Sequence, residues 1–483
     1  MEWFAAALFL LSFVASTRLL KLVQKSRAAI SLAHRSIRTI RCLSLSVEAK
    51  ELALQRNAKE LLRVFFALAF GGTVAILPAF GLLWLCDKIG FLSLASVLDV
   101  LRSPVFLVAS GAIGALLLYT GSVTCSKKNR YSGLDRTLHR LAFRTYGLQA
   151  SIAELEDQIF AKPLATCPIH RPVFITALPR TGTTVLLECC ASLPEFASHC
   201  YRDMPFVLIP CLWSSFSARF RQSSALLERA HGDGFLINVN SPEALEEVLW
   251  KTFWQPHYQS DRIIPWESEE APEFDAFFQN HMRKILMLRR GNEAPFARYV
   301  SKNNLNIARI QMLHRLFPDA IIIIPFRKPL DHAASLLEQH RNFLRIHQED
   351  RFALEYMEAI GHYDFGENVR PIDFGGWLKA RDARDTDCLA FWLEYWVNTY
   401  RYLLMDNAVS AHFFNYDTLC KDPEGGLQAV ATAMEIRDLR AISKAATRVR
   451  SPRQRKIALQ GVPVSLMREA DAVYASLTEL ELH

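Results

Sequence analysis

The chain has no Cys-x-x-Cys pair, and none of its ten cysteines stands with histidines at the spacing of a zinc site. Because such spacing is what surrounds a zinc ion with ligands, we expect no metal site. Scattered cysteines are typical of small buried hydrophobic residues in a reducing compartment. We expect this role for Cys189 and Cys190, which adjoin each other in a predicted helix.

An excess of positive charge is also missing over most of the chain. Residues 1–128 hold 15 Lys and Arg against 6 Asp and Glu, whereas the remaining residues hold 41 against 43. A nucleic-acid-binding domain carries a basic face, so this distribution predicts no nucleic-acid partner. A basic excess confined to the N-terminal quarter favours a membrane anchor instead.

Two long segments of this N-terminal quarter lack charge altogether. Residues 64–86 and 104–125 comprise 23 and 22 uncharged residues, enough to cross a hydrocarbon core of about 30 Å. We expect a third span at about 3–20, where a signal peptide is the alternative. Residues 21–63, with ten Lys and Arg, form either a basic helix on the inner leaflet or a solvated connector. The positive-inside rule then predicts a multi-pass protein of the bacterial inner membrane, with the lipid bilayer as a partner and everything after residue 126 in the cytoplasm.

The most informative segment runs from Phe174 to Thr184. It predicts a strand that ends in a tight loop and passes directly into a helix over 185–193. Backbone N–H groups converge at a helix N-terminus, and the helix dipole adds positive potential, so phosphate is the natural ligand. The residues expected to bind it are Arg180, Thr181, Gly182, Thr183 and Thr184. The structural alternative is a glycine turn followed by helix-capping threonines.

This loop is not a Walker A loop. Ala177 stands in place of the first glycine, Thr183 stands in place of the lysine, and the cation has moved to Arg180. The lysine that bridges the phosphates of ATP or GTP is therefore missing, which argues against a nucleotide kinase or another P-loop phosphotransferase.

Two further segments carry cations at the ends of predicted strands. The continuous apolar run 320–324 is typical of a strand buried on both faces of a parallel sheet, and Arg327 follows it. Ser335 lies eight positions later in a predicted helix, where its hydroxyl can join the arginine on a phosphate. Upstream, Lys302 follows a predicted strand over 298–301.

Together these segments resemble the sulfotransferase family over about residues 130–435. The loop has the family's Pro-(Lys/Arg)-x-Gly-Thr form, and Arg327 and Ser335 have the spacing of the family's 3′-phosphate ligands. Lys302 occupies the place of a lysine that contacts the transferred sulfate, although Asn304 replaces the proline that usually follows. The resemblance implies a P-loop-NTPase-like α/β fold with a mostly parallel sheet flanked by helices.

The resemblance also implies a reaction and a set of roles. The donor would be 3′-phosphoadenosine 5′-phosphosulfate (PAPS), and no metal would take part. Arg180 and its loop would hold the 5′-phosphate, Arg327 and Ser335 would anchor the 3′-phosphate, and Lys302 would neutralise the moving sulfuryl group.

The catalytic base is not identified by the resemblance. Membrane-type members have a glutamate about twenty residues after the loop cation, but residues 197–205 contain none. Asp203 is the nearest carboxylate and His199 is the alternative, either of which suits general-base catalysis. An ion pair between Arg202 and Asp203, and a histidine at a strand end, are the structural alternatives.

We therefore expect a membrane anchor over 1–125 and a sulfotransferase domain over 126–483, with an acceptor-side insertion at about 197–290. Strands are predicted at the positions 172–178, 298–301, 320–325 and 411–416. The acceptor expected from a membrane location is a hydroxyl or amine of a lipid or a glycan. A non-catalytic membrane protein that retains the fold is the remaining alternative, and the sequence does not indicate an oligomeric state.

Three other features have structural interpretations. In the insertion, Glu243, Glu246 and Glu247 follow Ser241 and Pro242, which is typical of a helix start. The aromatic helix predicted around Trp392 and Trp396 is assigned to core packing rather than acceptor stacking. The basic run 448–456 is either a solvated segment or one that closes over the nucleotide.

Overall fold

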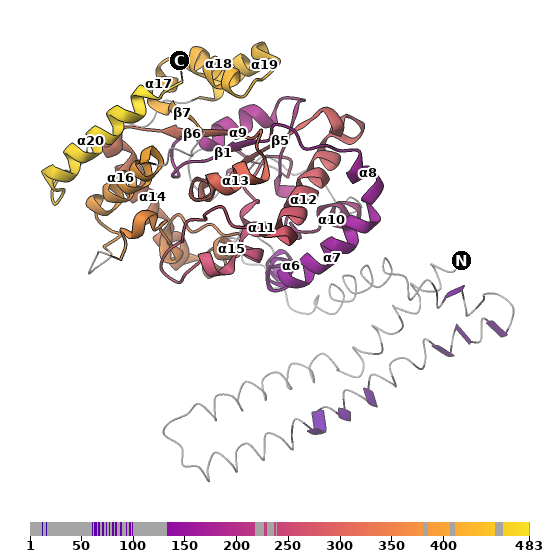
Figure 1. Ribbon diagram of the computed structural model, residues 1–483. Helices are drawn as coiled ribbons and strands as arrows, with labels where there is room; N and C mark the ends of the chain where they lie inside the picture. The colour runs from indigo at the N-terminus through magenta and orange to yellow at the C-terminus, as the bar shows by residue number, and fades with distance from the viewer. Residues whose placement is uncertain are drawn as a thin grey trace, which may run out of the picture. The chain divides into compact units, whose positions relative to one another are not determined.

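The computed structural model places one part of the chain in detail. It describes the residues 133–217, 227–228, 236–237, 239–379, 385–405, 411–449 and 457–482, with scattered positions between 12 and 99 (Figure 1). The chain divides into two compact units, Met1–Arg136 and Thr137–His483.

The expected membrane spans fall mostly outside these residues. The segment 104–125 lies wholly outside them, and only scattered positions of 3–20 and 64–86 are included. Within the described part of the chain, no helix combines the length and the apolar character that crossing a bilayer requires.

A parallel sheet of five strands forms the centre of the second unit (Figure 1). In spatial order its strands are β2 (Phe196–Ala197), β5 (Arg298–Lys302), β1 (Val173–Ile175), β6 (Ile321–Phe326) and β7 (His412–Asn415). Every residue of β1 and β6 is buried, as a parallel sheet covered on both faces requires. The mostly parallel α/β sheet predicted from the sequence is confirmed. Four of its strands lie at the predicted positions, and β2 adds an edge.

One face of the sheet packs against a cluster of helices from both ends of this unit. They are α9 (Thr183–Ala191), α17 (Tyr416–Lys421), α18 (Pro423–Ala433) and α19 (Leu439–Ser443). Alternate residues of the central strands, such as Ile321 and Ile323, enter this core because side chains alternate across a strand. Cys189 and Cys190 are 0% and 1% exposed in it, so the prediction of buried cysteines is confirmed for this pair.

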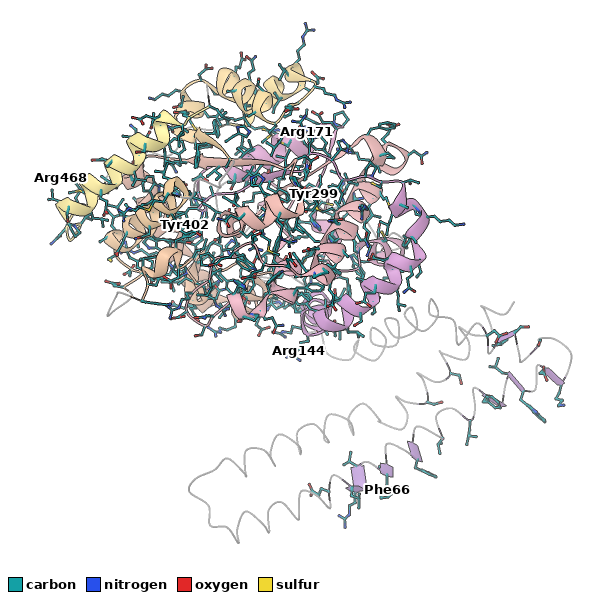
Figure 2. All side chains as sticks on the ribbon, in the orientation of Figure 1. Phe66, Arg144, Arg171, Tyr299, Tyr402 and Arg468 are labelled. Carbon is teal, nitrogen blue, oxygen red and sulfur yellow. The ribbon has the colours of Figure 1, made fainter. Side chains whose placement is uncertain are left out.

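The opposite face is lined by aromatic rings. Phe174 packs against Tyr299 and Phe317, with ring centroids 6.3 and 6.0 Å away, and Phe317 meets Phe278 of α12 (Pro272–Arg290). Tyr299, labelled in Figure 2, is 1% exposed. These contacts pack one face of β1 and β5, the two strands whose carboxyl ends precede the candidate site.

A group of three helices beyond β6 and β7 completes the second unit. α14 (Pro329–Glu349), α16 (Leu389–Met405) and α20 (Val464–Glu479) pack against one another (Figure 1). Trp392 and Trp396 of α16 are 1% and 0% exposed, which confirms their assignment to the core.

The remaining α-helices and strands of the second unit's described residues precede the sheet or interrupt it. They are α6 (Gly133–Arg144), α7 (Tyr146–Ile159), α8 (Ala161–Ala165), α10 (Pro210–Ser217), the hairpin β3 (Leu227–Glu228) and β4 (Leu236–Ile237), α11 (Glu247–Phe253), α13 (Ile310–Leu316) and α15 (Arg351–Ala359). The region 197–290, expected as an insertion, therefore holds mainly helices. Lys284 of its helix α12 forms a buried ion pair with Glu156 of α7 at 2.8 Å, which ties the insertion to the start of the unit.

Candidate active site

The turn between β1 and α9 contains two residues in the left-handed region of backbone space. Arg180 has φ +76° and Gly182 has φ +83°. Glycine adopts this conformation readily, whereas a non-glycine residue pays of order 1–3 kcal/mol for it. Such strain is concentrated at functional sites, and the rest of the loop must hold Arg180 in place.

Three side chains hold Arg180 in place, because they form hydrogen bonds to three consecutive carbonyl oxygens of the loop. Thr181 Oγ1 donates to Leu178 O at 3.0 Å, His332 Nε2 lies 2.8 Å from Pro179 O, and Arg327 Nη1 donates to Arg180 O at 3.1 Å. Burial, with a smaller contribution from the charge of Arg327, lowers the pKa of His332 to about 3, so its ring is neutral and donates through Nε2–H. These bonds fix the loop and occupy oxygens that would otherwise repel an anion.

The helix that follows starts without a side-chain cap. Gly182 is the N-cap residue of α9, and the first backbone bond of the helix runs from Leu186 N to Gly182 O at 3.2 Å. The N–H groups of the first turn precede that ladder and have no partner within the helix. A helix N-terminus of this kind attracts a phosphate.

Gly182 also leaves no space for a side chain. A Cβ at this position would lie 2.0 Å from the Tyr416 ring, which begins α17. Gly182→Ala is therefore expected to lower the free energy of unfolding by about 2–3 kcal/mol, from the clash and the left-handed backbone together. Urea unfolding of the full chain measures this change.

Gly461 is the matched control for that prediction. It has φ +80°, but no atom lies within 4 Å of its would-be Cβ. Gly461→Ala therefore reports the conformational cost alone, about 1 kcal/mol. Equal losses in the two variants would show that Tyr416 does not constrain the loop.

The loop meets the end of β5 across the sheet. β1 and β5 run parallel with Ile175 opposite Lys302, and Asn303 N donates to Ile175 O at 3.1 Å. Because both strands end at the same edge, Lys302 is brought beside the phosphate-binding turn.

A cavity of about 80 Å³ lies at this edge. Its walls are Pro179, Arg180, Thr183, Thr184, Glu243, Ala244, Glu247, Lys302, Asn303, Asn304, Leu305, Ile360, Gly361, His362, Asp364 and Phe365. Four predicted site residues thus share one cavity, namely Arg180, Thr183, Thr184 and Lys302. Two cations and a helix N-terminus meet there, an arrangement that can bind and stabilise a transferring oxyanion.

The other predicted donor ligands lie outside this cavity. Thr181 is 0% exposed, and Arg327 is 4% exposed. Besides its bond to Arg180 O, Arg327 has Nε 3.5 Å from Asp417 Oδ1. Ser335 lies in α14 and is 2% exposed. Arg327 therefore contacts the loop without lining the cavity, and its role and that of Ser335 stay predictions.

The two predicted bases also lie away from this cavity. Asp203 is 3% exposed, pairs with Arg289 through both of its oxygens, and accepts from Cys200 N at 3.0 Å. Burial alone would raise the pKa of Asp203, but His199 at 3.4 Å and the Arg289 charge hold it below its usual range. The structural alternative for Asp203 was an ion pair with Arg202, but its partner in the structure is Arg289 of α12.

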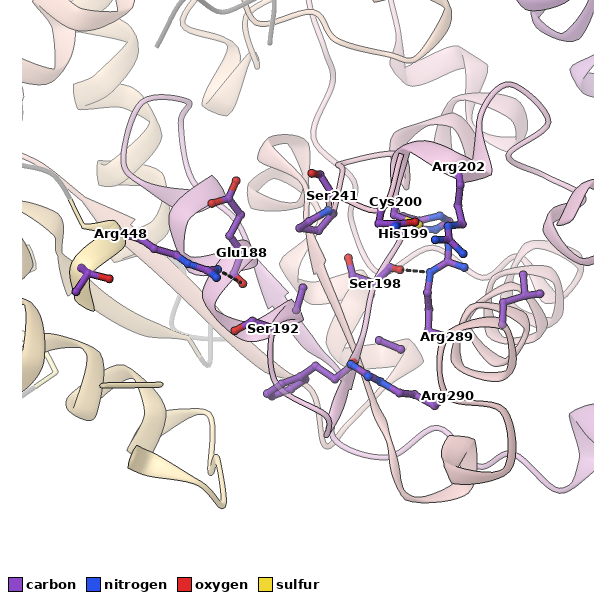
Figure 3. Close-up of a pocket in the computed structure, with 17 residues that line it drawn as sticks. Glu188, Ser192, Ser198, His199, Cys200, Arg202, Ser241, Arg289, Arg290 and Arg448 are labelled. Carbon is purple, nitrogen blue, oxygen red and sulfur yellow. Dashed lines mark hydrogen bonds between the residues drawn. The ribbon is translucent and has the colours of Figure 1, made fainter. Parts of the chain in front are cut away.

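His199 lines a different and larger hollow of about 750 Å³ beside the edge strand β2 (Figure 3). Its ring stacks on His281, with centroids 5.0 Å apart. Figure 3 shows two arginine contacts at this hollow, from Arg289 to Ser198 O at 3.0 Å and from Arg448 to Glu188 O at 3.2 Å. Neither Asp203 nor His199 is brought together with Arg180 and Lys302, so their catalytic role gains no support from this geometry.

Sequence reasoning missed the acidic and histidine side chains that do line the cavity. The sequence predicts a helix start after Ser241 and Pro242 for these glutamates, but α11 begins only at Glu247, and Pro242 forms an isolated β-bridge with Cys200. His362 and Asp364 follow no strand, so no motif marked them. Within the described residues, no group of three or more His, Cys, Asp and Glu is placed to hold a metal ion.

The sequence matches one family of known proteins. The model of a group described as the sulfotransferase family matches residues 172–439. Two solved structures are similar at 15% identity, sulfotransferase STF1 from Mycobacterium tuberculosis H37Rv and sulfotransferase STF9 from Mycobacterium avium. The match to STF1 covers 75% of this chain and 91% of the STF1 chain, with a TM-score of 0.38. The match to STF9 covers 80% of this chain and 90% of the STF9 chain, with a TM-score of 0.39. No curated protein matches the chain.

Proposed function

The chain belongs to the sulfotransferase family, and from this we propose that it transfers a sulfuryl group from PAPS to a hydroxyl or amine of its acceptor. The observation that supports the proposal most is the cavity shared by Arg180, the start of α9 and Lys302. A bound phosphosulfate would place its phosphate on the helix N-terminus and its sulfuryl group toward Lys302.

The residues present fit this donor. Thr183 and Thr184 line the cavity at the first turn of α9, and the three bonded loop carbonyls leave the adjoining surface favourable for an anion. Arg327 and Ser335 are proposed to bind the 3′-phosphate of the nucleotide. Because Arg327 is buried against Arg180 O and Asp417, donor binding would require its guanidinium to exchange one of these contacts for the phosphate.

The reaction requires in-line attack by the acceptor oxygen or nitrogen on sulfur. A new bond to sulfur forms as the bond from sulfur to the bridging oxygen of the phosphosulfate breaks. Its electron pair then leaves on the 5′-phosphate of 3′-phosphoadenosine 5′-phosphate (PAP). Lys302 would neutralise the sulfuryl oxygens, and Arg180 with the loop N–H groups would stabilise the leaving phosphate.

We extend the proposal to location and acceptor. The basic excess of residues 1–128 and the uncharged segments within them support a bacterial inner-membrane protein whose catalytic domain faces the cytoplasm, where PAPS is made. A lipid or glycan at that membrane is the proposed acceptor. Labelled sulfate recovered in the lipid extract of cells making the protein, and absent with Lys302→Ala, would support it.

Calorimetric titration of the full chain in detergent with PAP tests the donor, with ATP as the competitor class. We expect micromolar binding of PAP that ATP does not match. Arg327→Ala should weaken PAP binding about 10- to 100-fold, since a charged hydrogen-bonded contact contributes about 1.5–3 kcal/mol. Tighter binding of ATP than of PAP would favour a phosphotransferase, and no PAP binding by the folded protein would overturn the proposal.

Two further variants keep that test specific. Arg327→Lys keeps the charge but loses the planar fork, so we expect an intermediate loss. Arg345→Ala removes an exposed arginine later in α14 whose guanidinium contacts Asn342, and it should bind PAP as the unchanged protein does.

A further inference from the structure

Sulfuryl transfer to a hydroxyl needs a group that accepts the acceptor's proton, and the cavity offers four candidates. They are Glu243, Glu247, His362 and Asp364. Under the proposed sulfotransferase function, one of these four side chains performs this step.

The carboxylate of Glu247 already accepts hydrogen bonds from several side chains of the protein. Arg309 Nη2 donates to both of its oxygens, at 3.0 and 2.8 Å, and Asn303 Nδ2 donates at 2.7 Å. Tyr258 supplies a further hydrogen bond. Burial raises the pKa of Glu247 against these donors, but both of its oxygens are occupied by hydrogen bonds within the protein, so we assign Glu247 to the packing of the site.

His362 and Asp364 form a pair on the cavity wall. His362 Nε2 lies 3.4 Å from Asp364 Oδ2, and the two side chains are 20% and 13% exposed. Asp364 Oδ2 also accepts from Asn304 Nδ2 at 2.8 Å, which fixes the carboxylate next to the loop that follows Lys302. The His362 ring stacks on Phe343, with centroids 5.7 Å apart.

The loop that carries this pair is anchored to α14. Gly366 N donates to His340 Nδ1 and Glu367 N donates to His347 Nδ1, each at 3.1 Å. A Cβ on Gly366 would lie 2.4 Å from the His347 ring, so the loop is pressed against the helix. Because α14 directly follows Arg327 and contains Ser335, the proposed 3′-phosphate ligands and the loop of His362 are held by the same helix.

We propose that His362 is the catalytic base that takes the proton of the acceptor, and that Asp364 stabilises the resulting imidazolium. The acceptor oxygen bonds to sulfur, the bridging oxygen leaves with PAP, and the acceptor's proton passes to Nδ1 of the His362 ring, because Nε2 faces Asp364. The ring then releases this proton to solvent, so charge and atoms balance over one turnover.

The charges around His362 suit a neutral ring that can take up a proton. Burial lowers the pKa of His362, Asp364 and Glu243 act to raise it, and Lys302 acts to lower it. His347 of α14 is a further titratable neighbour. The ring is therefore neutral near pH 7, and the imidazolium formed during transfer is paired with a carboxylate.

The test measures the rate at which PAPS is converted to PAP over a range of pH. Water serves as the acceptor, so the natural acceptor need not be known. His362→Asn is expected to lower this rate about 100-fold or more, the usual contribution of general-base catalysis. The unchanged protein should lose activity as pH falls and the ring becomes protonated, and the variant should lose that acidic limb. PAP affinity, measured by calorimetry, should stay within about threefold.

Two companion variants decide between the outcomes. His412→Asn changes another histidine whose pKa burial lowers, at the start of β7 and outside the cavity walls, and it should retain the rate and the acidic limb. Glu243→Gln replaces the competing carboxylate and should change the rate less than about tenfold. A normal rate and pH profile in His362→Asn, with the loss appearing in Glu243→Gln, would overturn this assignment.

Binding of PAP separates a misassigned base from a wrong function. If the unchanged protein binds PAP and converts PAPS while His362→Asn does so equally well, only the base is misassigned. If the unchanged protein does not bind PAP, the proposed function itself fails.

Discussion

Replacement of Lys302 by alanine is expected to lower turnover of PAPS about 10³-fold while PAP affinity changes less than about threefold. Lys302 shares the cavity with Arg180 and the start of α9, where charge accumulates on the sulfuryl oxygens as the bond to the leaving phosphate breaks. Loss of one preorganised donor at such a position typically costs 10²–10³ in rate, and a full positive charge lies at the upper end. PAP has no sulfuryl group, so its binding does not need Lys302.

This split between rate and affinity is what separates a transition-state contact from a binding contact. Lys302→Arg should recover part of the rate because the charge is kept while its geometry changes. Lys162→Ala, at an exposed lysine of α8, is the matched control and should behave as the unchanged protein. A Lys302→Ala variant that keeps its turnover but binds PAP weakly would place the lysine on the nucleotide instead.

The sequence was sufficient to predict the edge of the sheet where the site lies. The uninterrupted isoleucines before Arg327 predicted a doubly buried strand, and parallel pairing then follows from covered faces. The pairing of β5 with β1, which puts Ile175 opposite Lys302, is a long-range contact that the structure supplies. Local patterns therefore predict the strands and the edge at which the site lies, whereas long-range strand pairing brings Arg180 and Lys302 into one cavity.

The base could not be predicted in the same way because its neighbours are remote in sequence. The sequence predicts Asp203 as a catalytic base, with an ion pair to the adjacent Arg202 as the structural alternative, but its partner is Arg289, 86 positions later. His362 lies in a loop without strand or helix periodicity, and this loop is held to α14 where Gly366 N and Glu367 N donate to His340 and His347. Such placement is set by tertiary contacts, and hydrophobic patterns do not report them.

The second large effect is expected at Arg309, which is 0% exposed behind the cavity. Its guanidinium lies 4.3 and 4.2 Å from the ring centroids of Trp250 and Trp266 and pairs with Glu247. Arg309→Ala leaves that buried carboxylate without its cation and removes two cation–π contacts, so we expect a loss of about 3–5 kcal/mol in the free energy of unfolding. Urea unfolding followed by tryptophan fluorescence measures it.

Two comparison variants identify the cause of this loss. Arg315→Ala breaks a partly exposed pair with Asp275 and should cost only about 1 kcal/mol. Arg309→Met combined with Glu247→Leu removes both buried charges, and replacement of a buried ion pair by apolar residues is often close to neutral. A double variant as unstable as Arg309→Ala would show that packing against the tryptophans, and not the unpaired carboxylate, dominates.

The pH dependence of the Arg309→Ala loss follows from Glu247. Burial already raises the pKa of Glu247 against the opposing charge of Arg309. Removing that charge raises the pKa further, so the folded state holds a proton that the unfolded state has released. Stability then falls as pH rises above the ordinary glutamate pKa of about 4.3. We expect the deficit relative to the unchanged protein to be at least about 1 kcal/mol smaller at pH 5 than at pH 8.

Because Glu247 also holds Asn303, the residue after Lys302, relief of the charge at low pH should restore stability without restoring the lysine's position. Turnover relative to the unchanged protein at the same pH should therefore stay low across the range in which the fold recovers. A parallel recovery of stability and relative turnover would show that Glu247 does not position Lys302.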